Sequence, residues 1–239
     1  MKKRLDIILT EKNLVKSRSQ AADLIKRGKV TVDTKVVTKP SLLISPEAVT
    51  SLDTSEQFVS RGGIKLSHAL KEFNVSIKNK TCIDIGSSTG GFTECLLKNE
   101  AFKVYAVDVG KDQFDPHLKE DPRVILMEQT DIRKASIPEK VDCIVIDVSF
   151  ISLTHILPVL APLLKEKTDI VCLIKPQFEV GRDRIPKNGV VTNENDRKEV
   201  VEHIKKTGES LGFVHKQTIE SPILGGDGNK EFFIYFATI

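Results

Sequence analysis

Polar residues stand directly behind five apolar runs of this chain, where they can bind or transform a ligand. A glycine-rich segment, DIGSSTGGFT at residues 84–93, overlaps the end of the first run. Asp108, Asp131 and Asp147 stand at or near the ends of the next three runs, and Lys175 ends the fifth. Carboxylates accept hydrogen bonds from hydroxyl and amino groups, and a lysine donates them or, when neutral, accepts a proton. These residue types indicate a site for a polar ligand.

The spacing of the glycines limits which ligand this is. Gly86, Gly90 and Gly91 let the backbone approach a ligand closely. Their G-x-x-x-G-G pattern differs from the G-x-G-x-x-G of dinucleotide sites, and the sequence contains no Gly-Lys-[Ser/Thr] phosphate loop. Asp108 closes the second run, where a carboxylate can accept from both hydroxyls of a ribose. Together with Asp131, these features indicate a site for S-adenosylmethionine (SAM).

The expected SAM site has further members in the same loops. Asp84 either orients the amino group of SAM or caps the loop, and we favour the first role. Phe92 either packs near the cofactor or belongs to the core of the following helix. Ser87 in the glycine-rich segment and Val109, directly after the second run, complete the set. The predicted site therefore spans the loops after the first two strands.

The elements that must position these residues form an alternating pattern. Five apolar runs suit buried strands, and four segments between and after them suit helices. The strands are TCIDI, KVYAVDV, VILM, CIVIDV and DIVCLIK, and the helices are GGFTECLLKN, the region near Asp112–Lys119, LTHILPVLAPLLKE and NDRKEVVEHIKKTGESLG. Pro158 and Pro162 predict that the third helix is kinked or short. This alternation predicts an α/β fold with a doubly wound, Rossmann-like sheet. Two last strands, near Val214–Glu220 and Glu231–Ala237, are expected to form a hairpin at one edge.

The bulk properties are those of a globular protein. The chain has 239 residues, of which 40% are hydrophobic and 29% charged, enough for one large domain or a medium and a small one. No apolar run approaches the roughly 18 residues that span a bilayer, and the apolar stretch near the N-terminus is too short for a secretory signal. We therefore expect a cytoplasmic protein with no membrane partner. The four cysteines form no C-x-x-C pair, so buried, reduced thiols are expected and no metal site.

Charge is distributed unevenly along the chain. Residues 1–40 hold 11 Lys and Arg against 4 acidic residues, a net charge of +7, whereas the remainder holds 25 and 29, a net charge of −4. A basic head on a mildly acidic body indicates a nucleic-acid-binding module attached to a second domain. A solvated basic surface is the alternative.

Apolar periodicity predicts that the basic head folds. Leu5, Ile8 and Leu9 share one helix face, and Ser17 with Gln20 forms a capping box before a second helix. The second helix has Ala21, Leu24 and Ile25 on its buried face and Gly28 as its terminator. Two β-branched runs around residues 33–34 predict a hairpin, and residues 41–57 resemble a connector because turn formers and acids dominate them.

This head resembles the S4 RNA-binding domain. The resemblance is carried by Arg4-Leu5-Asp6, Ser17-Arg18, Ala21, Leu24-Ile25, Gly28, Val30, Val32 and Lys39-Pro40. One departure is Asp33-Thr34, where the family usually has Asn-Gly. The resemblance implies binding to structured RNA, in which phosphate contacts supply affinity and salt dependence but do not select a sequence. The implied phosphate-facing residues are Arg4, Arg18, Lys26, Arg27 and Lys39.

The order of motifs in the rest of the chain is SRGGIKL, DIGSSTGGFT, an acid after the second strand, DVSF, IKPQFE and NKEFFIYF. This order resembles the FtsJ-type ribose 2′-O-methyltransferases and, with the S4 head, the haemolysin-A-like family of rRNA methyltransferases. The resemblance covers essentially the whole chain. It implies that a Lys-Asp-Lys-Glu tetrad carries catalysis and falls on Lys65, Asp147, Lys175 and Glu231. Lys65 then points into the active site, although lysines are mostly exposed, and Arg61 beside it is an RNA-binding candidate.

The same resemblance implies a division of labour along the chain. Residues 1–57 are expected to form the S4-type domain and connector, and residues 58–239 the SAM-dependent methyltransferase domain. The implied partners are ribosomal RNA or ribosomal subunits, with the ribose of a cytidine as the target. The nucleotide, the subunit and the oligomeric state stay open.

The residue types of the tetrad suit this chemistry. Methyl transfer from a sulfonium needs a ribose hydroxyl that is aligned and at least partly deprotonated in the transition state. Our hypothesis is that Lys175 orients the hydroxyl and accepts its proton; the alternative is a charged lysine that stabilises the developing alkoxide. For other members, Asp147 could instead cap a helix, and Glu231 could simply begin an edge strand. Gln177 and Glu179 could line the pocket in their place.

Three other classes of function compete with this interpretation: base methyltransferases, membrane-active proteins and non-catalytic RNA-binding proteins. A cytosine-5 methyltransferase needs a cysteine nucleophile, but Cys143 and Cys172 lie inside strands. An N-methylating enzyme needs an Asn/Asp-Pro-Pro-aromatic loop, whereas this chain has DVSF. A membrane-active haemolysin needs spanning segments, and none is predicted. The intact tetrad argues against a non-catalytic RNA-binding assembly factor, an alternative that a measured absence of SAM binding would revive.

Overall fold

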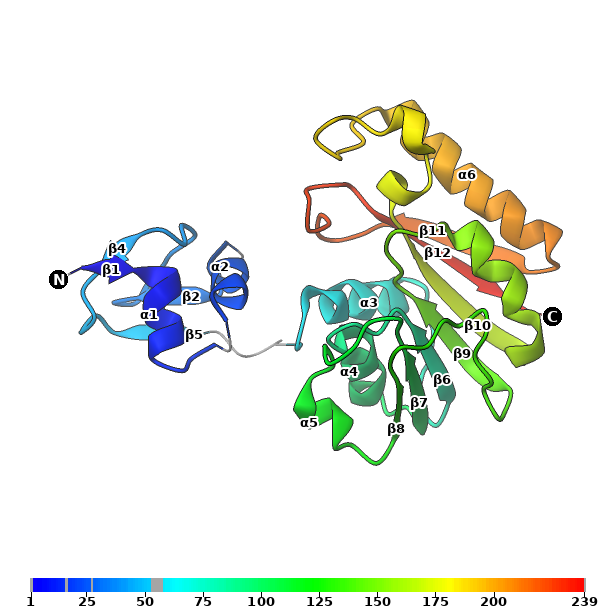
Figure 1. Ribbon diagram of the computed structural model, residues 1–239, viewed down its shortest axis with the longest axis horizontal. Helices are drawn as coiled ribbons and strands as arrows, with labels where there is room; N and C mark the ends of the chain where they lie inside the picture. The colour runs from blue at the N-terminus through cyan, green and yellow to red at the C-terminus, as the bar shows by residue number, and fades with distance from the viewer. Residues whose placement is uncertain (1, 16, 27, 53–57, 239) are drawn as a thin grey trace. The chain divides into compact units, whose positions relative to one another are not determined.

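Two structural units make up the chain (Figure 1). The computed structural model describes residues 2–15, 17–26, 28–52 and 58–238. The units are Met1–Gln57 and Phe58–Ile239, called the first and the second unit below. Each has its own apolar core, one around the helices of the first unit and one on either face of the sheet of the second.

The first unit combines two helices with short strands. Helix α1 spans Leu5–Glu11 and helix α2 spans Arg18–Lys26. The strands are β1 (Lys3–Arg4), β2 (Val30–Val32), β3 (Lys35–Val36), β4 (Leu43–Ile44) and β5 (Thr50–Leu52). Strand β2 pairs antiparallel with β3 and β5, and β1 pairs with β4. The apolar faces predicted for both helices are buried against this framework.

The turn between β2 and β3 forms although it lacks Asn-Gly. Asp33 and Thr34 both have positive φ angles, 47° and 70°, which a two-residue hairpin turn of this hand requires. The Asp33 carboxylate accepts a hydrogen bond from the backbone N–H of Val49 at 3.0 Å, which ties the turn to the β4–β5 segment. Residues 41–52, predicted as a connector, instead supply strands β4 and β5 because their short apolar pieces pair with β1 and β2.

The second unit is built on a seven-stranded sheet in the order β11-β12-β10-β9-β6-β7-β8. Its strands are β6 (Thr81–Ile85), β7 (Lys103–Val107), β8 (Val124–Met127), β9 (Val141–Ile146), β10 (Leu164–Ile174), β11 (Val214–Glu220) and β12 (Phe232–Ala237). Strands β6 to β10 run parallel, and β12 is antiparallel to both β10 and β11. The predicted α/β class and the terminal hairpin at one edge are confirmed.

Helices cover both faces of this sheet (Figure 1). Helices α3 (Arg61–Glu72) and α4 (Gly91–Lys98) bury one face, and α6 (Glu194–Ser210) with the turns after β9 buries the other. Alternate residues of β9 therefore enter different cores, Val145 beneath α3 and α4 and Ile146 on the opposite side. Helix α5 is only Pro116–Lys119, with Asp115 as its N-cap, shorter than the region predicted.

The proline-rich segment after β9 contains no α-helix. Three short 3₁₀ turns, η1 (Leu153–His155), η2 (Leu157–Val159) and η3 (Ala161–Leu163), take the place of the predicted kinked helix. Pro158 and Pro162 fall in the first turns of η2 and η3, where a missing N–H costs nothing but an α-helix cannot continue through it. Two further turns of this kind are η4 (Pro176–Phe178) and η5 (Arg182–Arg184).

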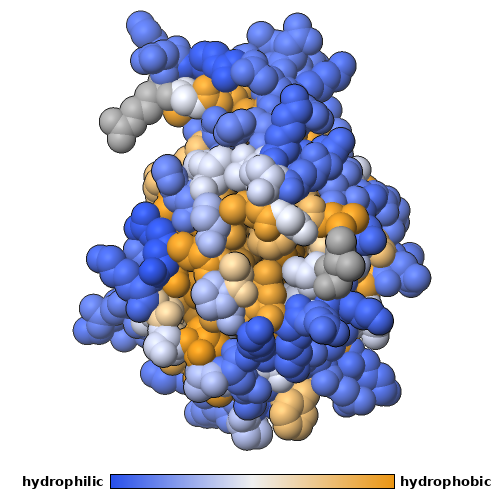
Figure 2. All heavy atoms as spheres, turned by 90° about the vertical axis from the view of Figure 1, so that its right-hand side faces the viewer, coloured by the Kyte–Doolittle hydropathy of each residue, from blue (hydrophilic) through white to orange (hydrophobic). Residues whose placement is uncertain are grey.

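Apolar side chains on the surface are interspersed with charged ones. Figure 2 shows one face of the second unit, with hydrophobic side chains gathered between hydrophilic neighbours. Among the described residues, none of the helices combines the length and the hydropathy needed to cross a bilayer. All four cysteines are buried free thiols, as predicted.

Candidate active site

Four residues meet at the carboxyl edge of the parallel strands, and we call them the tetrad: Lys65, Asp147, Lys175 and Glu231. Strands β10 and β12 pair with Ile174 opposite Phe232, so Lys175 and Glu231 stand opposite each other one position further on. Asp147 directly follows β9, the other neighbour of β10. Neighbouring strands lie about 4.8 Å apart, so three chain segments distant in sequence are brought together here.

Strand alternation directs the tetrad toward one face. The residues two positions away, within the three strands, belong to the core beneath α3 and α4: Val145, Leu173 and Phe233. Because alternate side chains of a strand share a face, Asp147, Lys175 and Glu231 continue the side that α3 covers. Lys65 lies on the buried side of α3, the helix that covers this face of the sheet.

The tetrad forms two ion pairs. Lys65 Nζ lies 2.5 Å from Glu231 Oε2, and the two side chains are only 8% and 2% exposed. Lys175 Nζ lies 2.6 Å from Asp147 Oδ1, and these side chains are 13% and 21% exposed. Lys175 also donates a hydrogen bond to Ser149 Oγ at 2.9 Å. The first pair is therefore an inner, buried one, and the second is reachable from solvent.

The glycine-rich loop brings backbone close to this edge. Gly86 has a φ of +87°, and a Cβ there would collide with the backbone carbonyl oxygen of Asp147. Gly90, with a φ of +94°, is the N-cap of α4, and Gly91 is its first residue. At Gly86, the absence of a side chain is what lets the loops after β6 and β9 pack so tightly.

Asp84 is a fully buried carboxyl beneath that loop. Thr93 Oγ1 donates to its Oδ2 at 2.6 Å, whereas Oδ1 has no hydrogen-bond partner in the described part of the chain. Burial, strengthened by the negative charges of Asp147 and Asp108, raises the pKa of Asp84 to about 7. Ser87 Oγ is also buried without a partner there. Both atoms are available to a polar ligand group.

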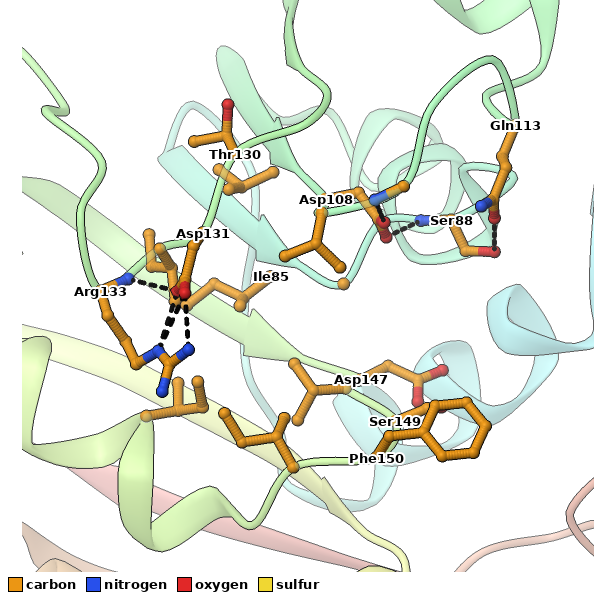
Figure 3. A pocket seen from close by; sticks show the side chains of 18 residues that line it. Ile85, Ser88, Asp108, Gln113, Thr130, Asp131, Arg133, Asp147, Ser149 and Phe150 are labelled. Carbon is orange, nitrogen blue, oxygen red and sulfur yellow. Dashed lines mark hydrogen bonds and ion pairs between the residues drawn. The ribbon is translucent and has the colours of Figure 1, made fainter.

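Carboxylates from three strand ends line a pocket of about 570 Å³ beside the tetrad (Figure 3). Asp108 follows β7 and accepts hydrogen bonds from the backbone N–H groups of Ser88 and Gly110, at 2.8 and 2.6 Å. Asp131 forms an ion pair with Arg133 at 2.6 Å, and those hydrogen bonds lower the pKa of Asp131 to about 2. Together with Asp147 they make the wall of the pocket acidic.

The predicted cofactor residues divide into two groups. Gly86, Asp108, Val109 and Asp131 line the pocket, and Val109 is 73% exposed. The pocket wall does not include Asp84, Ser87, Gly90, Gly91 or Phe92. Phe92 is 3% exposed and stacks on Phe233, with ring centroids 6.2 Å apart, which is the core alternative considered from the sequence.

Two of the pocket residues that were not predicted lie next to the tetrad. Phe150 is 90% exposed, lines the pocket and has a φ of +65°, which is strained for a bulky residue. Ser149 lines the pocket and holds Lys175. The signal was the DVSF motif after a strand, but exposure and backbone strain cannot be read from residue types. Gln177 and Glu179, considered as alternatives, do not line the pocket.

The predicted RNA-binding residues differ in their availability. Arg4 and Arg18 both pair with Asp6, at 2.8 and 3.3 Å, and hydrogen bonding to Arg4 lowers the pKa of Asp6. Lys26, Lys39 and Arg18 are exposed, and the Arg4 side chain is 42% exposed. Arg61 begins α3 in the second unit, and Arg27 lies outside the described residues.

Known proteins share both units of this chain. Residues 58–238 match the FtsJ-like methyltransferase family, and residues 3–49 match the S4 domain. The chain is 39% identical to the 16S/23S rRNA (cytidine-2′-O)-methyltransferase TlyA of Mycobacterium tuberculosis, over 98% of this chain and 90% of that protein. It is 38% identical to Hemolysin A of Brachyspira hyodysenteriae, over 98% of this chain and 99% of that protein.

A solved structure agrees with these relatives. A hemolysin-named protein of Streptococcus thermophilus is 39% identical and superposes with a TM-score of 0.77, covering 99% of this chain and 88% of that one. Sequence similarity and fold therefore agree over both units. The chain belongs to the FtsJ-like methyltransferases that carry an S4 domain at the N-terminus.

Proposed function

We propose that this protein transfers a methyl group from SAM to a ribose 2′-hydroxyl of ribosomal RNA, at a cytidine. The observation that carries the proposal is the meeting of two Lys–carboxylate pairs beside an acidic pocket at the sheet edge. The M. tuberculosis relative is named for this reaction on both 16S and 23S rRNA. The choice of cytidine and of rRNA rests on that relative.

The pocket suits SAM in charge and shape. Asp108 retains acceptor capacity for the hydroxyls of a ribose, since a carboxylate offers about four lone pairs and two are in use. Gly86 lines the pocket, and its missing side chain lets the loop after β6 pack on the Asp147 backbone. Asp84 Oδ1 is without a partner among the described residues, and a ligand ammonium would satisfy it. When bound, SAM supplies an electrophilic methyl group on a sulfonium. These residues would hold the cofactor so that the methyl group faces the tetrad.

Lys175 is the tetrad member placed to touch the ribose. Its ammonium is held by Asp147 and Ser149 at the accessible end of the site, so a hydroxyl arriving there meets a fixed donor. Two roles fit this position: orienting the hydroxyl and accepting its proton, or stabilising the charge that develops on the oxygen. Lys65 and Glu231 form the inner ion pair, which carries no net charge and holds both side chains in a fixed position.

The exposed ring of Phe150 supports an RNA substrate. Bases of single-stranded or looped RNA stack on aromatic side chains, and such stacking is worth about 1–3 kcal/mol per base. Phe150 projects at the rim of the pocket, next to the residue that binds Lys175 (Figure 3). Stacking there would bring the ribose of the same or a neighbouring nucleotide toward the tetrad.

Methylation of ribosomal subunits tests the proposal. Purified 30S and 50S subunits are incubated with labelled SAM and protein, and the modified ribose is mapped by primer extension at low dNTP concentration. We expect transfer by the wild type and a loss of about 100-fold or more for Lys175→Ala. Lys165→Ala is the matched control, because Lys165 lies at the other end of β10 and pairs with Asp142 at 2.9 Å. No transfer to either subunit by the wild type would refute the proposed substrate.

A further inference from the structure

Two loops run side by side at the active-site edge, and three contacts join them. Segment 147–152 follows β9, and segment 175–179 follows its parallel neighbour β10. Lys175 binds Asp147 and Ser149 at one end of the contact. Phe178 packs against Phe150 in the middle, with ring centroids 5.0 Å apart. Glu179 accepts hydrogen bonds from the far end of the first segment. The second segment therefore contacts the first along its whole length.

Glu179 contributes two hydrogen bonds to this grip. Its Oε2 accepts from Ser152 Oγ at 2.5 Å, and its Oε1 accepts from the backbone N–H of Leu153 at 2.9 Å. Leu153 is the first residue of η1, where a backbone N–H has no partner within its own turn. Ser152 Oγ in turn accepts from the N–H of Thr154 at 3.1 Å. The carboxylate therefore fixes the exact point at which the loop ends and the turn begins.

The partners of Glu179 are neutral. Desolvation raises the pKa of Glu179, although its bonds to Ser152 and Leu153 oppose this. Among the described residues no cation forms an ion pair with it, in contrast to Asp147 and Asp131. A half-buried carboxylate that accepts only from neutral donors gains little from charge attraction. Its effect is to fix the positions of the groups that donate to it.

The segment between these two ends has a strained backbone and forms part of the pocket wall. Phe150 has a positive φ, which costs a non-glycine residue about 1–3 kcal/mol and persists only where the surroundings enforce it. The residues held between Lys175 and Glu179 also form part of the pocket wall: Asp147, Val148, Ser149, Phe150 and Ile151. Releasing the Glu179 end would let this wall and the partners of Lys175 shift together.

We propose that Glu179 is a positioning residue for methyl transfer, which acts through Ser152 and Leu153 to hold the 147–151 wall in its reactive geometry. The inference rests on the proposed function and goes beyond it, because Glu179 neither lines the pocket nor belongs to the tetrad. Within the KPQFE motif, Lys175 then takes part in the chemistry and Glu179 aligns the neighbouring loop. A displacement of about 1 Å at a reacting group can cost about 100-fold in rate.

The test compares Glu179→Ala with Asp169→Ala in the full-length protein. Asp169 is a matched control, because it is a half-buried carboxylate within β10, away from the active-site edge, that accepts from Tyr235 and pairs with Lys80, both at 2.6 Å. SAM affinity is measured by calorimetry, kcat and KM with ribosomal subunits, and stability by thermal unfolding. We expect Glu179→Ala to lower kcat about 10- to 100-fold and to weaken SAM binding about tenfold. Asp169→Ala should lose similar stability and keep both values.

Two milder variants separate alignment from charge. Glu179→Gln keeps an acceptor for the N–H of Leu153 and can donate to Ser152 Oγ, so it should recover most of the activity. Ser152→Ala removes one of the two bonds and should give a smaller loss of kcat than Glu179→Ala, even where the latter folds poorly. Equal kcat and SAM affinity for Glu179→Ala and Asp169→Ala would overturn the inference, as would a Glu179→Gln variant no better than Glu179→Ala. A wild type that binds SAM but methylates neither subunit would instead count against the proposed function.

Discussion

At the scale of single residues, burial separates the members of the tetrad by task. Lys65 and Glu231 are almost without solvent contact, whereas Lys175 and Asp147 retain some. A group that touches the substrate must be reachable, so the outer pair suits contact with the ribose. The inner pair suits a fixed position behind the outer pair, because a buried ion pair holds its geometry when it is hydrogen-bonded.

Replacing Lys175 with arginine tests whether this residue takes the proton. A guanidinium keeps the positive charge and can bind Asp147 but cannot be deprotonated in a protein. If Lys175 is the general base, we expect Lys175→Arg to lose about 100-fold or more in kcat at every pH. The measurement is a rate–pH profile under saturating SAM. Activity near that of the wild type would eliminate the base role and leave charge stabilisation.

Asp84 makes a prediction about stability and pH. Burial raises its pKa to about 7 from an ordinary 3.8, so between these values the native state holds a proton that the unfolded state has released. Stability must therefore fall as pH rises through this window and level off above it. We expect the loss from this group to be about 2–3 kcal/mol between about pH 5 and pH 7.5. Urea unfolding of wild type and Asp84→Asn should show this difference, because the amide does not titrate; a gap independent of pH would contradict the assignment.

At the scale of elements, sequence patterns were sufficient for the framework. The five parallel strands are predictable because apolar runs of four to six residues favour a covered sheet, although the edge strand β8 is only partly buried. The resemblance was needed to group the tetrad, since no local pattern links Lys65 on a helix with Glu231 before strand β12. The exposure of Phe150 and the contacts of Glu179 could not be predicted, because both depend on how two loops meet, which strand patterns leave open.

A buried ion pair joins helix α3 to Glu231, the residue before β12, and we expect breaking this pair to destabilise the protein. Lys65→Met takes away the cation and leaves the Glu231 carboxylate 2% exposed without its partner. Breaking one side of a buried pair typically costs about 3–5 kcal/mol, and we expect a loss of this size in urea unfolding. The double variant Lys65→Met/Glu231→Leu should regain most of the stability but not the activity. If the double variant is as unstable as the single one, packing and not the charge pair holds α3.

At the scale of the whole molecule, the proposed RNA binding belongs to the first unit and the proposed methyl transfer to the second. The first unit has its own core and carries the basic excess, whereas the second unit carries the pocket and the tetrad. Within the first unit the cations are not equivalent. The side chains of Arg4, Arg18, Lys26 and Lys39 are all accessible. Arg4 and Arg18, however, pair with the buried Asp6, so part of their charge stabilises the fold.

This difference predicts how substitutions in the first unit act on the reaction. Lys26→Ala/Lys39→Ala should raise KM for ribosomal subunits, leave kcat at saturating substrate unchanged, and lower the slope of log affinity against log salt by about one for each lysine that contacts a phosphate. Arg4→Ala should act differently, because Asp6 is 3% exposed and loses its closest partner, so thermal stability should fall along with RNA affinity. The measurements are kinetics and filter binding over a salt series, with thermal unfolding of each variant. A fall in kcat for the double lysine variant would mean that the first unit takes part in assembling the active site, because simple tethering acts only before saturation.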